Sequence, residues 1–63
     1  MAWVAVDKNG YEYIFNYKPV REEISFECDE SYYESIYVKL PIGSIKKLIG
    51  RELTWSDEPV ELE

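Results

Sequence analysis

The N-terminal part of the chain carries two apolar runs, residues 3–6 and 11–15, separated by the segment Asp-Lys-Asn-Gly at 7–10. Apolar runs flanking a short segment that ends in Asn-Gly are the strongest local pattern for a β-hairpin. The pattern therefore predicts a hairpin over residues 3–15, around which the rest of the chain is organised.

Two turns can close this hairpin. A two-residue type I′ turn at the Asn-Gly pair would place Val6 opposite Tyr13, whereas a type I turn with a bulge at Gly10 would place Ala5 opposite Tyr13. We favour the bulged turn, because an Asp at its first position (Asp7) accepts hydrogen bonds from backbone N–H groups that follow. Glycine also adopts the positive φ of the bulge without steric cost.

Both faces of the predicted hairpin carry apolar side chains. Val4 and Val6 lie on one face, and Trp3 and Ala5 lie on the other, because successive side chains of a strand alternate. We therefore expect the second face to be covered as well, by a helix, by the C-terminal tail or by a second subunit.

Two later segments, 24–28 and 34–40, alternate apolar and polar residues with the period of a half-buried strand. The pattern predicts a second hairpin, with residues 20–23 as a connection before it and Ile36, Val38 and Leu40 facing inward. The two hairpins together predict a four-stranded antiparallel sheet.

A short helix is predicted near residues 44–50. Ser44 is the expected N-cap and Gly50 the expected left-handed residue at the C-terminal end. Ile45, Leu48 and Ile49 form an apolar stripe at helical spacing. A helix this short is unstable in isolation, so we expect the stripe to dock it onto the sheet.

The C-terminal tail predicts two further short strands. Leu53 and Trp55 belong to the first, and Val60 and Leu62 to the second, which Pro59 assigns to a sheet edge. The prediction for residues 1–63 is thus a single small α+β domain, with an antiparallel sheet of four or five short strands and one short helix.

With 63 residues, the chain is too short to form two domains with separate hydrophobic cores. A chain of this size buries only about 60% of the surface that its unfolded form exposes. Cys28 is the only cysteine, so no disulfide can form within the chain, and we expect a small buried apolar side chain. A lone cysteine indicates a reducing, cytoplasmic compartment. Neither a signal peptide nor an apolar run of about 20 residues is present, so we expect no membrane association.

Charge is unevenly distributed along the chain, whose net charge is −6. Residues 35–51 contain no acidic residue, whereas the remainder holds all thirteen carboxylates. The four basic residues of this segment form a candidate basic patch: Lys39, Lys46, Lys47 and Arg51. Most charge runs of this kind are solvated faces.

The composition excludes the commonest catalytic systems. Without histidine and with one cysteine, the chain cannot form Ser–His or Cys–His nucleophile systems or most zinc sites. The three glycines are scattered, so no phosphate-binding loop is present, and no pair of carboxylates is singled out by spacing. We expect no enzyme activity, no cofactor and no metal.

Aromatic residues make up 16% of the chain and are its most informative feature. Exposed Tyr and Trp are enriched at protein interfaces, where they often carry the binding energy. The candidate interaction residues are Tyr32, Tyr33, Tyr37 and Trp55. The sequence therefore favours a non-enzymatic role in binding a protein partner of unknown identity, and a homodimer would also support a small core.

Nucleic-acid engagement is the alternative. Tyr side chains on a sheet can stack on bases while the basic segment 39–51 contacts phosphates. An acidic, aromatic-rich chain could instead mimic nucleic acid and inhibit a nucleic-acid enzyme. The net negative charge and the lack of an RNA-recognition motif argue against direct binding, and the basic segment argues against mimicry.

Several segments resemble a class of small uncharacterised bacterial and phage proteins found in gut bacteria and their prophages. They are Trp-Val-Ala-x-Asp-Lys-x-Gly at 3–10, Leu-Pro-x-Gly-Ser-Ile at 40–45 and the distinctive ending Leu-Thr-Trp-x-Asp-Glu-Pro-Val-Glu at 53–61. The resemblance implies a compact intracellular protein associated with phages or mobile elements, and no activity is assigned to the class. It also implies that Trp55 locks the C-terminal end by packing on the hairpin, with residues 57–59 turning Val60 back to a sheet edge.

Overall fold

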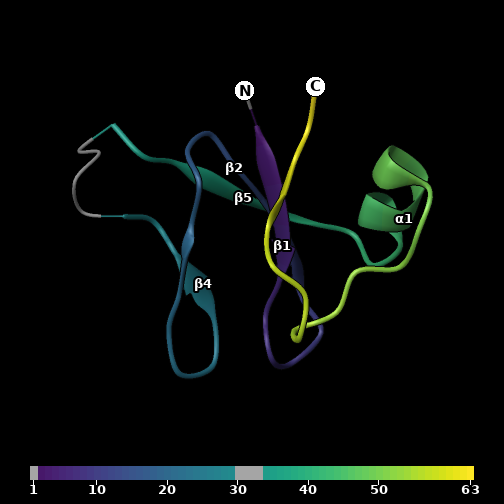
Figure 1. Ribbon diagram of the computed structural model, residues 1–63, viewed down its shortest axis with the longest axis horizontal. Helices are drawn as coiled ribbons and strands as arrows, with labels where there is room; N and C mark the ends of the chain where they lie inside the picture. Colours follow the sequence, from purple (N-terminus) through teal and green to yellow (C-terminus); the bar gives the residue numbers. More distant parts are fainter. Residues whose placement is uncertain (1, 30–33) are drawn as a thin grey trace.

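The computed structural model describes residues 2–29 and 34–63. Four antiparallel strands form one sheet in the order β5-β2-β1-β6, and two short strands form a separate β3–β4 ribbon. The elements are β1 (Trp3–Val6), β2 (Glu12–Phe15), β3 (Val20–Arg21), β4 (Phe26–Glu27), β5 (Tyr37–Leu40), α1 (Ser44–Ile49) and β6 (Val60–Glu61). This is the small α+β fold that the sequence predicts. In Figure 1 the β3–β4 ribbon and α1 lie on opposite sides of β1.

The N-terminal hairpin has the bulged turn. Ala5 lies opposite Tyr13, the backbone N–H of Asp7 donates to the carbonyl of Tyr11 over 2.9 Å, and Gly10 has a φ of 91°. The favoured register is therefore confirmed, and positive φ at the bulge explains the glycine.

The expected role of the Asp7 side chain within this turn is wrong. Its Oδ1 accepts a hydrogen bond from the backbone N–H of Phe26 in β4, over 2.9 Å. The turn uses Asn9 instead, whose Oδ1 accepts from the backbone N–H of Tyr11 over 3.0 Å. Asp7 thus joins the hairpin to the β3–β4 ribbon.

Each face of the sheet has its own hydrophobic cluster. On one face, the buried residues are Val4 and Val6 of β1 together with Ile45 of α1 and Leu53. The half-buried residues around this cluster are Ile14, Leu40, Ile49, Val60 and Leu62. This cluster docks the helix, as expected.

The second face is covered too, which confirms that expectation. Ala5, Phe15 and Phe26 are buried there, and Trp55 packs against them from the C-terminal segment. The other half-buried members are Trp3, Tyr13 and Cys28. The covering elements are therefore the β3–β4 ribbon and part of the C-terminal tail.

The helix begins differently from the prediction. Gly43 is the N-cap, and no side-chain capping bond is made by the cap residue, so the assignment of Ser44 as N-cap is wrong. The buried carboxylate of Glu12 on β2 takes that role: Oε2 accepts from the N–H of Gly43 over 2.7 Å, and Oε1 from the N–H of Ile45 over 2.8 Å. The helix ends as predicted, with Gly50 in the left-handed region.

Only part of the predicted helix stripe is buried. Ile45 lies in the first cluster and Ile49 packs against it, whereas Leu48 is 53% exposed. The helix therefore packs on the first cluster through Ile45 and Ile49 and not through the whole predicted stripe.

The pairing predicted for the later strands is wrong. β5 pairs with β2, placing Tyr37 opposite Phe15, and β4 pairs with β3, placing Glu27 opposite Val20. Residues 20–21 therefore form a strand and not only a connection. A ladder next to the central hairpin gives β5 more apolar neighbours than the two-residue β4 could offer.

At the C-terminus, β6 is confirmed as an edge strand, with Val60 opposite Val4 of β1. The strand predicted at Leu53 and Trp55 is wrong, because this segment turns instead, with the N–H of Asp57 donating to the carbonyl of Thr54 over 3.0 Å. The N–H of Leu62 donates to the carbonyl of Ala2 over 2.7 Å, so the segments around these two residues lie side by side (Figure 1).

Candidate interaction surface

β5 forms an open edge of the sheet. In the part of the chain that the structure describes, β2 is its only strand neighbour. The backbone N–H of Asn16 donates to the carbonyl of Ile36 over 3.3 Å, and because bonded pairs alternate in an antiparallel ladder, Val38 and Leu40 also face β2 with their backbone groups. The N–H and C=O groups of Tyr37 and Lys39 therefore point outward.

Three consecutive apolar side chains are exposed along this edge. Ile36 is 65% exposed, Tyr37 56% and Val38 57%. Ile36 and Val38 lie on the same face as Leu40, as the alternation predicts, but the expected burial is wrong, because Ile45 of α1 packs on Val4 and Val6 of β1 and leaves the start of β5 uncovered. Of the three residues expected to face inward, only Leu40 packs against the first cluster.

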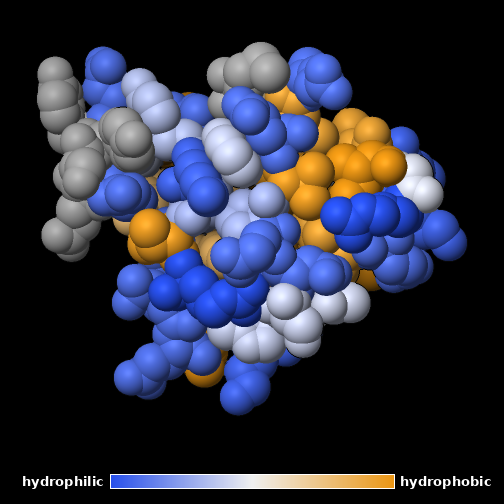
Figure 2. Space-filling view, viewed as in Figure 1, coloured by the Kyte–Doolittle hydropathy of each residue, from blue (hydrophilic) through white to orange (hydrophobic). Residues whose placement is uncertain are grey.

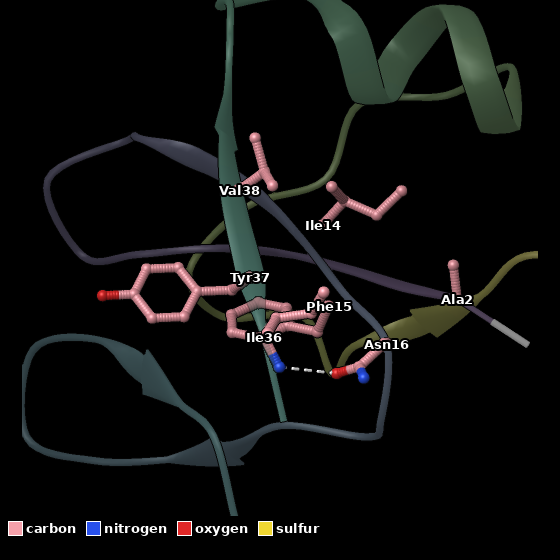
Figure 3. A pocket seen from close by; sticks show the side chains of 7 residues that line it. All are labelled: Ala2, Ile14, Phe15, Asn16, Ile36, Tyr37 and Val38. Carbon is pink, nitrogen blue, oxygen red and sulfur yellow. Dashed lines mark hydrogen bonds between the residues drawn. The ribbon is translucent and has the colours of Figure 1, made fainter. Parts of the chain in front are cut away.

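A shallow apolar groove of about 200 Å³ lies at this end of the sheet (Figure 3). Ile14 and Val38 extend toward one side of the sheet, and the ring of Tyr37 points another way. The side-chain Oδ1 of Asn16 accepts a hydrogen bond from the N–H of Ile36 over 2.8 Å and fixes the strand where it enters the sheet. The other lining residues are Ala2, Phe15 and Ile36.

On the face of β5 opposite Val38, the side chains of Tyr37 and Lys39 pack against aromatic rings. The ring of Tyr37 lies 5.7 Å from that of Tyr13 and 5.8 Å from that of Phe15, measured between centroids. Nζ of Lys39 lies 3.6 Å from the centroid of the Tyr11 ring, within the range of a cation–π contact. The side chains of Tyr37 and Lys39, whose backbone groups point away from β2, are thus held in place by aromatic rings of the N-terminal hairpin.

Of the predicted interaction residues, Tyr37 is on this surface and Trp55 is not. Trp55 is half-buried, its ring 5.3 Å from that of Phe26, and the guanidinium of Arg21 lies 4.5 Å from the Trp55 ring. Both of these contacts of the Trp55 side chain are with the β3–β4 ribbon. Tyr32 and Tyr33 lie outside the described residues.

Arg21 holds this C-terminal turn in place, a role that the sequence did not indicate. Its guanidinium lies beside both rings, 4.6 Å from that of Phe26 and 4.5 Å from that of Trp55. It donates to the carbonyl of Trp55, to that of Asp57 over 3.0 Å and to Oε2 of Glu58 over 3.0 Å. The acceptors lie 34 to 37 residues from Arg21 in the sequence, so no local sequence pattern predicts these hydrogen bonds.

Sequence reasoning also missed Ile36 and Val38 as surface residues, although one clue was present. Lys39 interrupts an apolar strand, and a lysine of this kind is typical of edge strands. Alternation identified the two faces of the strand but not whether another element covers them.

The candidate basic patch is divided between elements. Lys39 shares a face with its cross-strand neighbour Tyr13, while α1, which carries Lys46 and Lys47, packs on the other face. Nζ of Lys46 lies 3.7 Å from Oε1 of Glu52. In Figure 2, hydrophobic side chains gather beside α1, and the region over β4 is mostly hydrophilic.

Three described groups on the ribbon side have raised pKa values, namely Asp7, Tyr13 and Cys28. Burial raises the pKa of Asp7, the N–H of Phe26 partly opposes that effect, and the charge of Glu27 adds to it. Burial also raises the pKa of the half-buried Cys28 thiol, which lowers its thiolate fraction. Among the described residues, no group of three or more Cys, Asp or Glu side chains is placed to hold a metal ion.

The chain matches no family model, no curated protein and no solved structure. None of the described residues forms a helix with the length and apolar character needed to cross a membrane. The geometry of the β5 edge is therefore the strongest guide to function.

Proposed function

We propose that this chain is a non-enzymatic protein-interaction domain that binds an extended polypeptide segment along β5. The observation that carries the proposal is the exposure of Tyr37 and Val38 on β5, and of Ile36 directly before it, along a strand that has β2 as its only strand neighbour among the described residues. Open strand edges bind partners by adding a strand, with main-chain hydrogen bonds giving affinity and side-chain pockets giving specificity.

The energetic terms at this edge favour binding. Completing the burial of a half-exposed aliphatic side chain contributes on the order of 1 kcal/mol, and each net backbone hydrogen bond contributes about 0.5–1.5 kcal/mol. The strand is already ordered by β2 and by Asn16, so little conformational entropy is lost on this side of the contact. An added strand would therefore meet a preorganised template.

The proposal includes a cytoplasmic, phage- or mobile-element-associated setting. The lone cysteine supports the compartment, and the resemblance of the segments at 3–10 and 53–61 supports the association. Lys39 and Lys46 lie on different faces of the sheet and the chain is strongly acidic, and both features disfavour nucleic-acid binding.

Affinity capture from a bacterial lysate with three versions of the tagged chain tests the proposal. The versions are wild type, Val38→Lys on the open edge, and Ile42→Lys, which also replaces a highly exposed apolar residue (71%) but lies outside β5. We expect a stoichiometric protein that survives nuclease and about 0.5 M salt, that Ile42→Lys retains and that Val38→Lys loses.

Two outcomes would contradict the proposal. One is a partner retained equally by both lysine variants, which would place the contact elsewhere. The other is recovery of nuclease-sensitive material alone, whose binding falls steeply with salt as phosphate contacts do.

A further inference from the structure

Resting on the proposed function, we infer that the segment added to β5 is β5 of a second copy of this chain, paired antiparallel about a two-fold axis at Val38. Two four-stranded sheets then join into one eight-stranded sheet. The direction of the backbone groups of β5, its charge pattern and the character of the opposite sheet edge favour this pairing.

The backbone phase permits few registers. Only Tyr37 and Lys39 direct their N–H and C=O groups outward, so a bonded pair across the new ladder must join residues of this set. Shifting one β5 by one residue against the other would place backbone groups that point toward the partner strand opposite groups that point toward β2, and no hydrogen bonds would form between them. Placing Tyr37 opposite Lys39 of the partner subunit uses all of the outward groups within β5 and forms four backbone hydrogen bonds.

The alternatives in the same phase are worse. Centring the axis on Lys39 would oppose two ammonium groups directly, which is destabilising. Centring it on Tyr37 would place Lys39 opposite Ser35, which lies before the first backbone bond of the β2–β5 ladder, at Ile36. The axis at Val38 avoids both problems.

Side chains complement one another in this register. Lys39 is the only charged residue between 35 and 42, and it comes to lie opposite the aromatic ring of Tyr37 of the partner subunit. On the other face, Val38 meets its own copy and Ile36 lies opposite Leu40 of the partner subunit. An uninterrupted apolar row then covers the exposed edge of the groove in both copies.

The other sheet edge explains why association stops at two copies. β6 has only two residues, follows Pro59 and lies in an acidic segment that contains Glu58, Glu61 and Glu63. Two such edges repel one another, and Pro59 offers no backbone donor. The inference is therefore a closed dimer and not a growing sheet.

Molecular mass measured against concentration, by light scattering or sedimentation, tests the dimer. We expect wild type and Ile42→Lys to have twice the monomer mass at high concentration, and Val38→Lys to raise the dissociation constant at least about tenfold, because like charges would face one another at the axis. A wild-type chain that stays monomeric at every concentration would overturn the second copy as occupant. Species larger than a dimer would overturn closure.

Disulfide crosslinking tests the register and does not depend on the lysine variant folding. In a Cys28→Ser background, Val38→Cys should crosslink to its own copy under oxidised glutathione, because unbonded antiparallel pairs hold their Cα atoms about 4.5 Å apart, within disulfide range. Tyr37→Cys and Lys39→Cys should crosslink only when mixed. Crosslinking of Lys39→Cys alone, or none at Val38→Cys, would overturn the register.

The two proposals fail separately. A monomeric chain that still loses a captured protein on Val38→Lys, but not on Ile42→Lys, would refute the second copy and leave the strand-binding function intact. A dimer whose capture profile is insensitive to both variants would support the pairing and contradict the binding of other proteins through this edge.

Discussion

Asp7 and Glu12 are buried carboxylates on the central hairpin, and each ties a different element to it. Asp7 accepts the N–H of Phe26 in β4, and Glu12 accepts two N–H groups at the start of α1. A buried backbone donor left without a partner costs about 1–3 kcal/mol, so both carboxylates contribute more than their own contacts suggest. Their placement on opposite faces lets four residues of β1 and four of β2 organise the whole chain.

Two substitutions of Asp7 distinguish the contribution of its hydrogen bond to stability from the contribution of its charge. Asp7→Ala should lower the free energy of unfolding by about 1–3 kcal/mol, because the N–H of Phe26 loses its acceptor. Asp7→Asn keeps an acceptor oxygen and removes the desolvated charge, so we expect no loss at pH 7. Urea denaturation measures both, and equal losses would show that the charge itself is required.

The raised pKa of Asp7 also predicts a pH dependence. Because the folded pKa lies above the usual value of 3.8, the contribution of this group to stability is complete below 3.8 and is lost as pH rises through the folded pKa. Asp57 acts in the opposite sense, since hydrogen bonds from Thr54 lower its pKa and its contribution is lost on acidification. The stability difference between wild type and Asp7→Asn, measured from pH 3 to pH 8, isolates Asp7 and should increase in favour of wild type as pH falls.

At the scale of elements, α1 is held by its first turn. Ile45→Ala should lower the free energy of unfolding by about 2–5 kcal/mol, because Ile45 is fully buried against Val4 and Val6. Leu48→Ala removes an exposed side chain of similar size from the same helix and should change it by no more than about 0.5 kcal/mol. Denaturant titration compares the two, and comparable losses would mean that the helix docks through a wider face.

The elements that depend on a local sequence pattern were predictable. The contacts between elements that are distant in the sequence were not. The bulged hairpin, the helix end at Gly50 and the edge strand at Val60 follow from turn chemistry, glycine and proline. The cap supplied by Glu12 joins residues 31 and 33 positions apart, so no local motif encodes it. The pairing of β5 with β2 likewise depends on competition between distant strands.

The candidate surface was predictable to the same extent. Residue type pointed to Tyr37, which lies on the open edge, but it pointed equally to Trp55, which packs on Phe26. Alternation predicted that Ile36 and Val38 face inward, because a pattern shows which side chains share a face and not where the covering helix ends. Exposure on β5 is a consequence of the short reach of α1.

For the whole molecule, the division of a small chain into two clusters limits its stability. Each cluster contains only three or four buried residues, on opposite faces of one sheet. Association through β5 would extend that sheet, so folding and association are expected to be linked.

Linkage makes thermal stability depend on concentration. We expect the midpoint of thermal unfolding of the wild-type chain to rise by a few degrees, roughly, for each tenfold increase in concentration, because the native dimer is favoured by mass action. Val38→Lys should show no such rise. Calorimetry over two decades of concentration measures the trend, and a wild-type midpoint that stays constant would contradict a coupled dimer.

The strand order β5-β2-β1-β6 also determines what the paired protein would present to its surroundings. The hydrogen bond from the N–H of Leu62 to the carbonyl of Ala2 holds the C-terminal strand along β1, at the edge opposite β5. In the eight-stranded assembly, the two C-terminal strands would form the outermost edges. A domain fused after residue 63 would then lie at each outer edge of the eight-stranded sheet. Four strands would separate each fused domain from the β5–β5 interface, so the dimer would hold two fused domains at a fixed separation.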